Sequence, residues 1–302
     1  MSALTTPTLK ASSLAGKVVL LTGTNSGLGR QCALELAKLN PERIWMTARS
    51  PQKGKEAVDY VMRLVPGAAV EFLELDLSSF DSIKRAAKIV VASSVQLDVL
   101  VLNAGLMGCP PSLTAEGYEI QMGTNHVGHA LLLNLLTPLL LSTSSTGNPA
   151  RVISLSSSAW KHAGKERIQF DTLKSLTGAT PVSRYIQSKT ANMLYALEFA
   201  KRNPQLIVVS IDPGEVDTQL FTREPGDEQM VYLQTEVAPK LVKPVEVGVK
   251  NHIWAATASV VETGRHYEPV GVAAEPVGLL ADDQLANEVW EWTERELAGQ
   301  GI

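Results

Sequence analysis

The sequence predicts an α/β fold in which a doubly wound parallel sheet carries helices on both faces. Apolar runs of strand length alternate along the chain with segments of helical periodicity. Such alternation is typical of repeated βαβ units joined by right-handed crossovers. The run Leu97–Leu102 is apolar except for Asp98, as expected for a strand that is covered on both faces. The run Val18–Thr22 leads directly into a glycine-rich turn and then into a helical pattern.

The remaining elements follow in the same order along the chain. The predicted strands are Val18–Thr22, Arg43–Thr47, Val70–Leu75, Leu97–Leu102, Arg151–Leu155 and Leu206–Ile211. Besides the helix that begins near Gly27, the predicted helices are Lys53–Leu64, Ser82–Val91, Tyr118–Leu141 and Arg184–Lys201. Near the end, Asn287–Leu297 is expected to pack on the core or to contact another copy in a homo-oligomer. Because no linker rich in Pro, Gly or Ser divides the chain, we expect one domain over residues 16–302 after an N-terminal extension of residues 1–15.

Composition excludes several classes of protein. The formal net charge of −4 gives no reason to expect a nucleic-acid partner. Cys32 and Cys109 are too few for a disulfide framework and are expected to be reduced thiols. The most apolar run, Val127–Leu141, contains Asn134 and Pro138 and is judged too short and too polar for a transmembrane segment. Since no secretory signal is recognisable either, we expect a cytoplasmic protein.

The turn after the first strand predicts a phosphate-binding site. It reads Thr-Gly-Thr-Asn-Ser-Gly-Leu-Gly over Thr22–Gly29. Glycines let the backbone turn tightly and approach a ligand, and the following helix directs its free N–H groups at a pyrophosphate. A plain glycine-rich turn is the alternative, but the strand–turn–helix context favours the binding interpretation. The residues expected to contact the cofactor here are Gly23, Ser26, Gly27, Leu28 and Gly29.

The end of the second strand favours NADP(H) over NAD(H). Dinucleotide sites that bind NAD commonly place a carboxylate there, on the ribose 2′-hydroxyl. In this chain Arg49 occupies the position, and a guanidinium pairs well with a 2′-phosphate. Lys53 is a second candidate for the phosphate. A solvated arginine at the start of a loop is the alternative.

These motifs resemble those of the short-chain dehydrogenase/reductase family, whose turn reads Thr-Gly-x3-Gly-x-Gly. The resemblance covers roughly residues 16 to 270 and implies a Rossmann fold and a nicotinamide cofactor. Asp76, at the end of the third strand, would contact the adenine amino group or cap the next helix, which begins near Ser79. Asn103 would bond the adenine ribose or the neighbouring strand. The backbone at Val216 and the hydroxyl of Thr218 would hold the nicotinamide carboxamide.

The candidate catalytic pair is Tyr185 and Lys189. Residues four apart lie on the same face of a helix. An ammonium beside a phenol favours the phenolate and is expected to lower the tyrosine pKa from about 10. A phenol tuned in this way suits acid/base chemistry, although on its own a surface Tyr/Lys pair would be the plainer interpretation.

The same resemblance implies two further catalytic residues. Ser157, after the fifth strand, would bond the substrate oxygen, with Ser156 and Ser158 as rivals for that role. Asn125 would hold a water that links Lys189 to bulk solvent. His126 and His129 are three residues apart, but no third ligand is evident, so core roles are expected and no metal site is predicted.

The branch of the family is indicated by local sequence. The long interval between Ser157 and Tyr185, and the Gln-Ser-Lys-x-Ala-Asn pattern around Lys189, resemble retinol-dehydrogenase-like members. The segments Thr114–Tyr118 and Asn125–His129 are also similar to protochlorophyllide-reductase-like members.

The substrate side is the least determined part. Residues 217–241, which include Phe221, Met230, Tyr232 and Leu233, are expected to form a lid over the substrate. Side chains such as Met107, Met122 and Trp160 are expected to line an apolar pocket.

We therefore expect an NADP(H)-dependent oxidoreductase that moves a hydride between nicotinamide and a carbonyl or alcohol carbon. The small-molecule substrate is expected to be bulky and apolar, in lipid, retinoid-like or secondary metabolism. One alternative is reduction of a ring C=C bond. Another is a non-catalytic regulator that senses the cofactor, which retention of Tyr185 and Lys189 disfavours.

Overall fold

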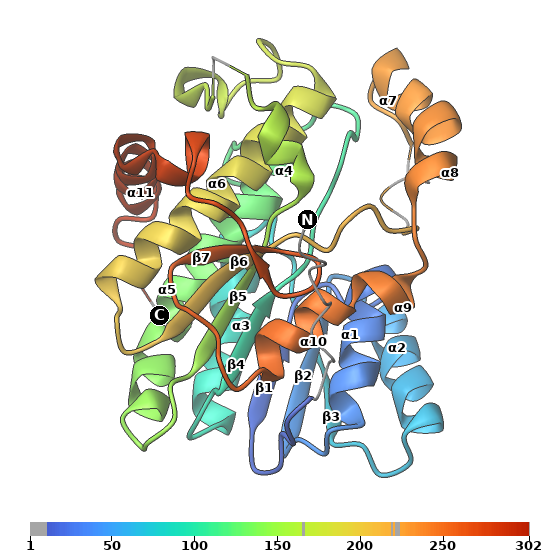
Figure 1. Cartoon of the computed structure of the whole chain (residues 1–302), viewed down its shortest axis with the longest axis vertical. Coiled ribbons are helices and arrows are strands. Elements are labelled where there is room, and N and C mark those ends of the chain that lie inside the picture. The colour runs from blue at the N-terminus through green and yellow to red at the C-terminus, as the bar shows by residue number, and fades with distance from the viewer. Residues whose placement is uncertain (1–10, 165–166, 219, 221–223, 302) are drawn as a thin grey trace, which may run out of the picture.

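The computed structural model describes residues 11–164, 167–218, 220 and 224–301 (Figure 1). At its centre an 8-stranded sheet has the order β3-β2-β1-β4-β5-β6-β7-β8. The strands are β1 Val18–Leu21, β2 Arg43–Ala48, β3 Val70–Glu74, β4 Val99–Leu102, β5 Arg151–Leu155, β6 Ile207–Ile211, β7 Arg265–Glu268 and β8 Val272–Ala273. All neighbours are parallel except β8, which runs antiparallel to β7. The predicted doubly wound sheet is confirmed, with one antiparallel edge strand added.

The strand order reverses at β1, and that reversal positions the site. Leu20 of β1 pairs with Trp45 of β2 on one side and with Leu100 of β4 on the other. Chain connections therefore leave β1 and β4 in opposite directions and open a crevice beyond their carboxyl ends. In open α/β sheets ligands bind at such a switch point.

Helices cover both faces of the sheet, as predicted. The longer ones are α1 Gly27–Ala37, α2 Pro51–Leu64, α3 Phe80–Ser93, α5 Gly128–Ser144, α6 Pro181–Arg202, α10 Lys250–Thr257 and α11 Asp283–Glu296. Short helices are α4 Ile120–Met122, α7 Glu228–Tyr232, α8 Ala238–Leu241 and α9 Val245–Gly248, and π-helical turns span Gly123–Val127 and Leu233–Val237. Figure 1 shows α7 and α8 at the upper right, apart from the helices that cover the sheet.

Alternation along the strands creates two separate hydrophobic clusters. In β1, Val18 and Leu20 pack with residues of α3, α5, α6 and α11, whereas Val19 and Leu21 pack with residues of α1, α2 and α10. All four β1 side chains are buried, which explains why the central strands read as continuous apolar runs.

Helix starts are set by side-chain caps. The Ser50 hydroxyl accepts a hydrogen bond from the Lys53 amide, and the Thr180 hydroxyl accepts one from the Ser183 amide. Ser79 caps α3 in the same manner, so the alternative that Asp76 is the cap is wrong. The caps start these helices a few residues earlier than periodicity alone predicts.

The helical segment Ile120–Ser144 is longer than the apolar run recognised in the sequence. By length and composition it could cross a membrane. In the structure most of it is buried in the protein core, where Leu132, Leu136 and Leu140 have no exposed surface. Buried core helices meet the same criterion, so the segment is accounted for by internal packing.

The C-terminal helix α11 packs against α6, which fits the predicted packing role. Trp290 stacks on Tyr195 with ring centroids 5.0 Å apart. The Thr293 hydroxyl oxygen lies 2.7 Å from His126 Nε2.

Candidate active site

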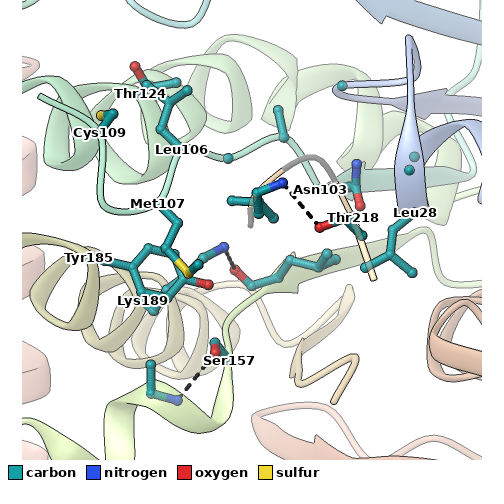
Figure 2. A pocket seen from close by; sticks show the side chains of 18 of the residues that line it. Leu28, Asn103, Leu106, Met107, Cys109, Thr124, Ser157, Tyr185, Lys189 and Thr218 are labelled. Carbon is teal, nitrogen blue, oxygen red and sulfur yellow. Dashed lines mark hydrogen bonds between the residues drawn. The ribbon is translucent and has the colours of Figure 1, made fainter. Parts of the chain in front are cut away.

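One large cavity lies beyond the carboxyl ends of β1, β4, β5 and β6. Its volume is about 1540 Å³, whereas sites for a single small ligand are roughly 300–1,000 Å³. It extends from the glycine turn and Arg49 at one end to residues of α7 and α8 at the other. Figure 2 shows Tyr185, Lys189 and Ser157 gathered on one side and Leu28, Asn103 and Thr218 on the other. The cavity can therefore hold a dinucleotide together with a second molecule.

The glycine turn is built as the phosphate-binding interpretation requires. Gly23 has a φ of 72°, and a Cβ on Gly29 would lie 2.1 Å from the Gly23 carbonyl oxygen. Ser26 precedes α1, but its hydroxyl caps no helical N–H group. The first turn of α1 carries no acidic residue, so its N–H groups remain suited to an anion. The five predicted turn residues all line the cavity: Gly23, Ser26, Gly27, Leu28 and Gly29.

Polar side chains line the end of the cavity near β2 and β3. Arg49 is exposed at the cavity wall beside Ser50 and Lys53. Asp76 also lines the cavity, and one of its carboxylate oxygens accepts hydrogen bonds from the Ser78 amide and hydroxyl, at 2.9 and 2.6 Å. A guanidinium and an ammonium here fit a phosphate group on an adenosine ribose.

Asn103 is held by the neighbouring strand, which was one of the two predicted alternatives. Its side-chain amide donates to the Thr22 carbonyl at 2.8 Å, and its backbone N–H donates to the Thr22 hydroxyl oxygen at 2.8 Å. Its carboxamide oxygen lies 3.3 Å from His252 Nε2. Asn103 thus joins β1 to the loop after β4 at the floor of the cavity.

Val216 and Thr218 close the cavity from the side of β6. Val216 is buried and forms an isolated bridge with Lys243, so its backbone is fixed in place. A Cβ on Gly27 would lie 3.4 Å from the Thr218 side chain, which places this threonine over the glycine turn. Residues 219 and 221–223 of the predicted lid, including Phe221, lie outside the described residues.

The tyrosine and lysine predicted to act together lie side by side in α6. Both are buried and line the cavity. Lys189 Nζ lies 5.9 Å from the centre of the Tyr185 ring and donates to the Leu155 carbonyl at 3.0 Å. Their one-turn spacing on a helix face therefore gives the predicted juxtaposition.

The pKa prediction for Tyr185 is wrong in direction for the structure as it stands. Burial raises the pKa of Tyr185 to about 12, although a hydrogen bond with Ser157 opposes the shift. Burial also lowers the pKa of Lys189 to about 8, while the nearby carboxylate of Asp212 opposes that change. Loss of solvent sets the direction of both shifts because both groups are enclosed by protein, and the Asp212 carboxylate raises the Tyr185 pKa further.

Hydrogen bonding distinguishes the three candidate serines. Ser156 is buried and donates to the Lys189 carbonyl at 2.8 Å, which commits it to the backbone. Ser158 donates to a Glu215 carboxylate oxygen at 3.0 Å. The Ser157 hydroxyl accepts from the Ala159 amide at 3.2 Å and is also hydrogen-bonded to the Tyr185 side chain, a contact that lowers the Tyr185 pKa. Ser157 is therefore the serine best placed to bond a substrate oxygen beside Tyr185.

Asn125 lies in the π-helical turn behind the cavity wall and has no exposed surface. Its side-chain amide donates to the Leu106 carbonyl and to the Ser188 hydroxyl, both at 2.9 Å. Its carboxamide oxygen accepts from the Leu106 amide at 2.8 Å. A Cβ on Gly105 would lie 3.5 Å from Asn125 Oδ1 and 3.7 Å from Lys189 Nζ. Asn125 thus joins the loop after β4 to the turn of α6 that carries the tyrosine and lysine.

The predicted pocket lining is correct only in part. Met107 lines the cavity, but Met122 and Trp160 are buried in the core. Met122 of α4 is almost fully buried in the larger core cluster, and the Trp160 indole donates to His266 at 3.3 Å. Within the described part of the chain, no cluster of His, Cys, Asp or Glu could hold a metal ion.

Two features of the site were not predicted. Asp212 is buried close enough to Lys189 and Tyr185 to affect the pKa of both, and it directly precedes the Pro-Gly turn that leads to Val216. Gly108 contacts the segment predicted to form the lid: a Cβ there would lie 2.2 Å from Met230 Sδ. The Asp212-Pro-Gly motif could have drawn attention to the carboxylate, whereas no local signal indicates the glycine contact.

Comparison with known proteins agrees with the fold. The family model described as short chain dehydrogenase matches residues 17–229. The chain is 32% identical to the short-chain dehydrogenase/reductase drtF of Aspergillus calidoustus, over 94% of this chain and 95% of that protein. It is 34% identical to human retinol dehydrogenase 12, over 84% and 78% of the two chains. A crystal structure of an uncharacterized protein from Mycobacterium paratuberculosis has a TM-score of 0.73 at 30% identity and covers 95% of both chains.

The fold and these relationships define a Rossmann-fold oxidoreductase that works with a nicotinamide cofactor. The chain belongs to the short-chain dehydrogenase/reductase family, and the predicted family and its retinol-dehydrogenase-like character are confirmed.

Proposed function

We propose that this protein is an NADP(H)-dependent enzyme that transfers a hydride between nicotinamide and the carbonyl or alcohol carbon of a bulky apolar small molecule. One observation carries the proposal. Tyr185, Lys189 and Ser157 line the same cavity as the glycine turn, so one continuous space joins a dinucleotide-binding end to an acid/base pair. When bound, the nicotinamide supplies or accepts the hydride.

The residues of the chain perform the remaining chemistry. In carbonyl reduction, the hydroxyls of Ser157 and Tyr185 donate hydrogen bonds to the substrate oxygen and stabilise its developing negative charge. Tyr185 then releases its proton to that oxygen. Lys189 places a cation beside the resulting phenolate and is expected to bond the ribose hydroxyls. Alcohol oxidation uses the same groups in the reverse direction.

The preference for NADP(H) rests on the end of β2. Arg49 and Lys53 line the cavity where β2 runs into α2, and β2 ends at Ala48 with no carboxylate in the positions that follow it directly. A 2′-phosphate there would gain charge-assisted hydrogen bonds from the guanidinium.

The apolar nature of the substrate is supported by the part of the cavity beyond Tyr185. Its walls come from the loop after β4, from α4 and α6, and from the lid. Apolar side chains on these walls include Met107, Ile120, Val182, Ile186, Leu233 and Leu241. Such a lining favours a substrate with a large hydrocarbon body.

The test is turnover by the purified protein. NADPH and NADH are supplied with apolar ketones, aldehydes and enones, and NADP⁺ with the matching alcohols; the panel includes retinoid-like and secondary-metabolite compounds. We expect oxidation of NADPH with a carbonyl substrate. Product analysis of the enones separates carbonyl reduction from saturation of a C=C bond. Binding of NADPH without any turnover would instead support a regulator and contradict the proposal.

A matched pair of tyrosine variants tests the assigned acid. Tyr185→Phe should reduce turnover by roughly 10²- to 10⁴-fold, the usual contribution of a general acid or base, while leaving NADPH affinity nearly unchanged. Tyr195→Phe is the control, because Tyr195 lies in the same helix but its hydroxyl bonds Asn134 and Glu294 in the core. Equal losses in the two variants would contradict the assignment.

A further inference from the structure

His129 is a buried side chain for which the mechanism above gives no role. It lies in α5 with 3% of its surface exposed. One ring nitrogen, Nδ1, is 2.8 Å from the Asn125 carbonyl oxygen, and the other, Nε2, is 2.9 Å from the Thr22 hydroxyl. It therefore connects the π-helical turn to the end of β1, two segments that border the cavity wall from different sides.

The direction of each hydrogen bond follows from the partners. A carbonyl oxygen only accepts, so His129 Nδ1 must carry the proton and donate it to Asn125. Nε2 then has a free lone pair and accepts from the Thr22 hydroxyl at 2.9 Å, a closer contact than the 3.4 Å from that hydroxyl to its other acceptor, the Val101 carbonyl. The Thr22 oxygen in turn accepts the backbone N–H groups of Asn103 and Ala104, at 2.8 and 2.9 Å. Each proton in this series of hydrogen bonds has an acceptor. Only the imidazole tautomer with its proton on Nδ1 allows all of these bonds.

Burial and the hydrogen bond from the Thr22 hydroxyl both favour the neutral ring. Burial lowers the pKa of His129 to about 3, while the hydrogen bond to the Asn125 carbonyl opposes the shift. A charged ring would have to donate from both nitrogens and would lose the bond in which Thr22 is the donor. The arrangement therefore needs an uncharged imidazole with its proton on Nδ1.

The hydrogen bonds that run through His129 lead to Asn125, whose side chain helps to hold Tyr185 and Lys189 in place. The Asn125 side chain contacts Leu106 and Ser188, and Ser188 donates to the Tyr185 carbonyl at 2.8 Å. Displacement of the Asn125 backbone would therefore move both the loop after β4 and the turn of α6. Such shifts matter because a misplacement of about 1 Å can reduce turnover by roughly 100-fold.

We propose that His129 is a positioning residue that ties Asn125 to Thr22 and thereby fixes the loop after β4 and the turn of α6 relative to the bound cofactor. The inference rests on the proposed function for its effect on turnover, whereas the hydrogen-bond arrangement can be tested without any turnover.

Three variants separate positioning from simple core packing. His129→Leu removes both hydrogen bonds. His129→Gln keeps a donor and an acceptor at the end of the side chain. His126→Leu is the matched control, because His126 is also buried and also meets a threonine hydroxyl, Thr293 Oγ1 at 2.7 Å, but on the side of α11.

The expected result is a selective loss of kcat. His129→Leu should lower kcat by about 10- to 100-fold, with smaller changes in the substrate KM and in NADPH affinity. His129→Gln should recover most of that loss. His126→Leu should lower thermal stability by a similar amount to His129→Leu yet keep near-normal kcat. If the two leucine variants lose equal activity, or glutamine restores none, the positioning role is wrong.

A second measurement needs no substrate. Nitrogen-15 NMR of the protein labelled at histidine should show His129 protonated at Nδ1 and unchanged between pH 5 and pH 8, with the signal identified by its absence in His129→Gln. A proton on Nε2, or titration near the ordinary pKa, would overturn the arrangement. The NMR measurement does not depend on turnover. If the unmodified protein turns over no substrate, that result therefore counts against the proposed function and leaves the hydrogen-bond arrangement to be judged by NMR.

Discussion

At the scale of single residues, Arg49 and Lys189 are two cations of the same cavity in opposite surroundings. Arg49 is exposed, so its charge is fully hydrated until an anion displaces water from it. Lys189 is buried, and the loss of hydration lowers its pKa to about 8. Arg49 is suited to select a charged ligand, whereas Lys189 is suited to respond to a proton that moves next to it.

Replacement of the exposed cation should separate the two cofactors. Arg49→Ala is expected to weaken NADPH binding by about 1.5–3 kcal/mol, the usual contribution of a charged hydrogen bond. NADH binding should hardly change because NADH has no 2′-phosphate. Fluorescence titration of both cofactors measures this, and Arg85→Ala, an exposed arginine of α3 outside the cavity, is the control. Equal weakening of NADPH and NADH would contradict the assignment.

The raised pKa of Tyr185 predicts different pH profiles for the two reaction directions. In reduction Tyr185 donates a proton, and a phenol with a pKa of about 12 is protonated throughout the neutral range. Reduction should therefore vary little from pH 6 to pH 7, where Lys189, with a pKa of about 8, also keeps its charge. In oxidation the phenol must be ionised to accept a proton, so kcat/KM should rise by about tenfold per pH unit below that pKa. Steady-state kinetics in both directions provide the check, and a flat oxidation profile would be incompatible with this role.

At the scale of elements, Gly108 is the point at which α7, in the segment predicted to form a lid, meets the loop after β4. Its N–H donates to Gln121 Oε1 at 2.9 Å, and its carbonyl accepts from the Gly226 amide at 2.7 Å. Gln121 also donates to the Pro181 carbonyl at the start of α6. Met230 of α7 has no exposed surface because it packs on this glycine. The loop after β4, the lid and the helix of the acid/base pair are thus linked through one position.

A side chain at this position should loosen the lid. Gly108→Ala places a methyl group 2.2 Å from Met230 Sδ in backbone of φ +57°, so the contact must open. We expect the KM for apolar substrates to rise by about tenfold, consistent with a cost of 1–3 kcal/mol for overpacking. NADPH affinity should stay unchanged, because the glycine turn is distant in the fold from α7. Gly117→Ala is the control, because Gly117 has a φ of +82° and no atom lies within 4 Å of the new methyl group. A rise of the same size in the KM of Gly117→Ala would contradict the role of the Gly108 contact.

At the scale of the whole molecule, most of the histidine side chains are buried without a charge. Four of the five histidines are buried, and burial lowers each pKa from 6.5 to between about 3 and about 4; they are His126, His129, His252 and His266. Glu119 and Asp212 are buried carboxyl groups with raised pKa values, which act in the opposite sense but are fewer. The balance favours acid sensitivity of the whole fold.

The sign of this effect can be derived by linkage. Below pH 6.5 the unfolded chain binds protons on these histidines while the folded chain does not, so stability is complete above pH 6.5 and decreases as the pH falls towards 4. Each histidine can contribute up to about 1.4 kcal/mol per pH unit. Urea unfolding at pH 7, 6 and 5 measures the slope, and His266→Gln should make it shallower. Stability that does not change between pH 7 and pH 5 would show that the histidines protonate freely in the fold.

The predicted elements and the observed ones differ for identifiable reasons. Strands β1 to β6 were predictable because each is an apolar run between turn residues, and burial on both faces demands that composition. Strands β7 and β8 were missed because they are short, and the buried pair His266 and Tyr267 is flanked by Arg265 and Glu268. The mixture of polar residues at this edge of the sheet conceals the alternation.

The sequence alone determined the chemistry available to this protein: the glycine turn, the arginine after β2, and a tyrosine and lysine one helical turn apart. Those signals are local, since each depends on spacing within a single element. Tertiary structure decided which serine hydroxyl meets Tyr185, that the Tyr185 pKa rises, that Met122 and Trp160 belong to the core, and that His129 bridges β1 and the π-helical turn. Burial and hydrogen-bond partners depend on residues brought together from distant parts of the chain, so no spacing along the sequence specifies them.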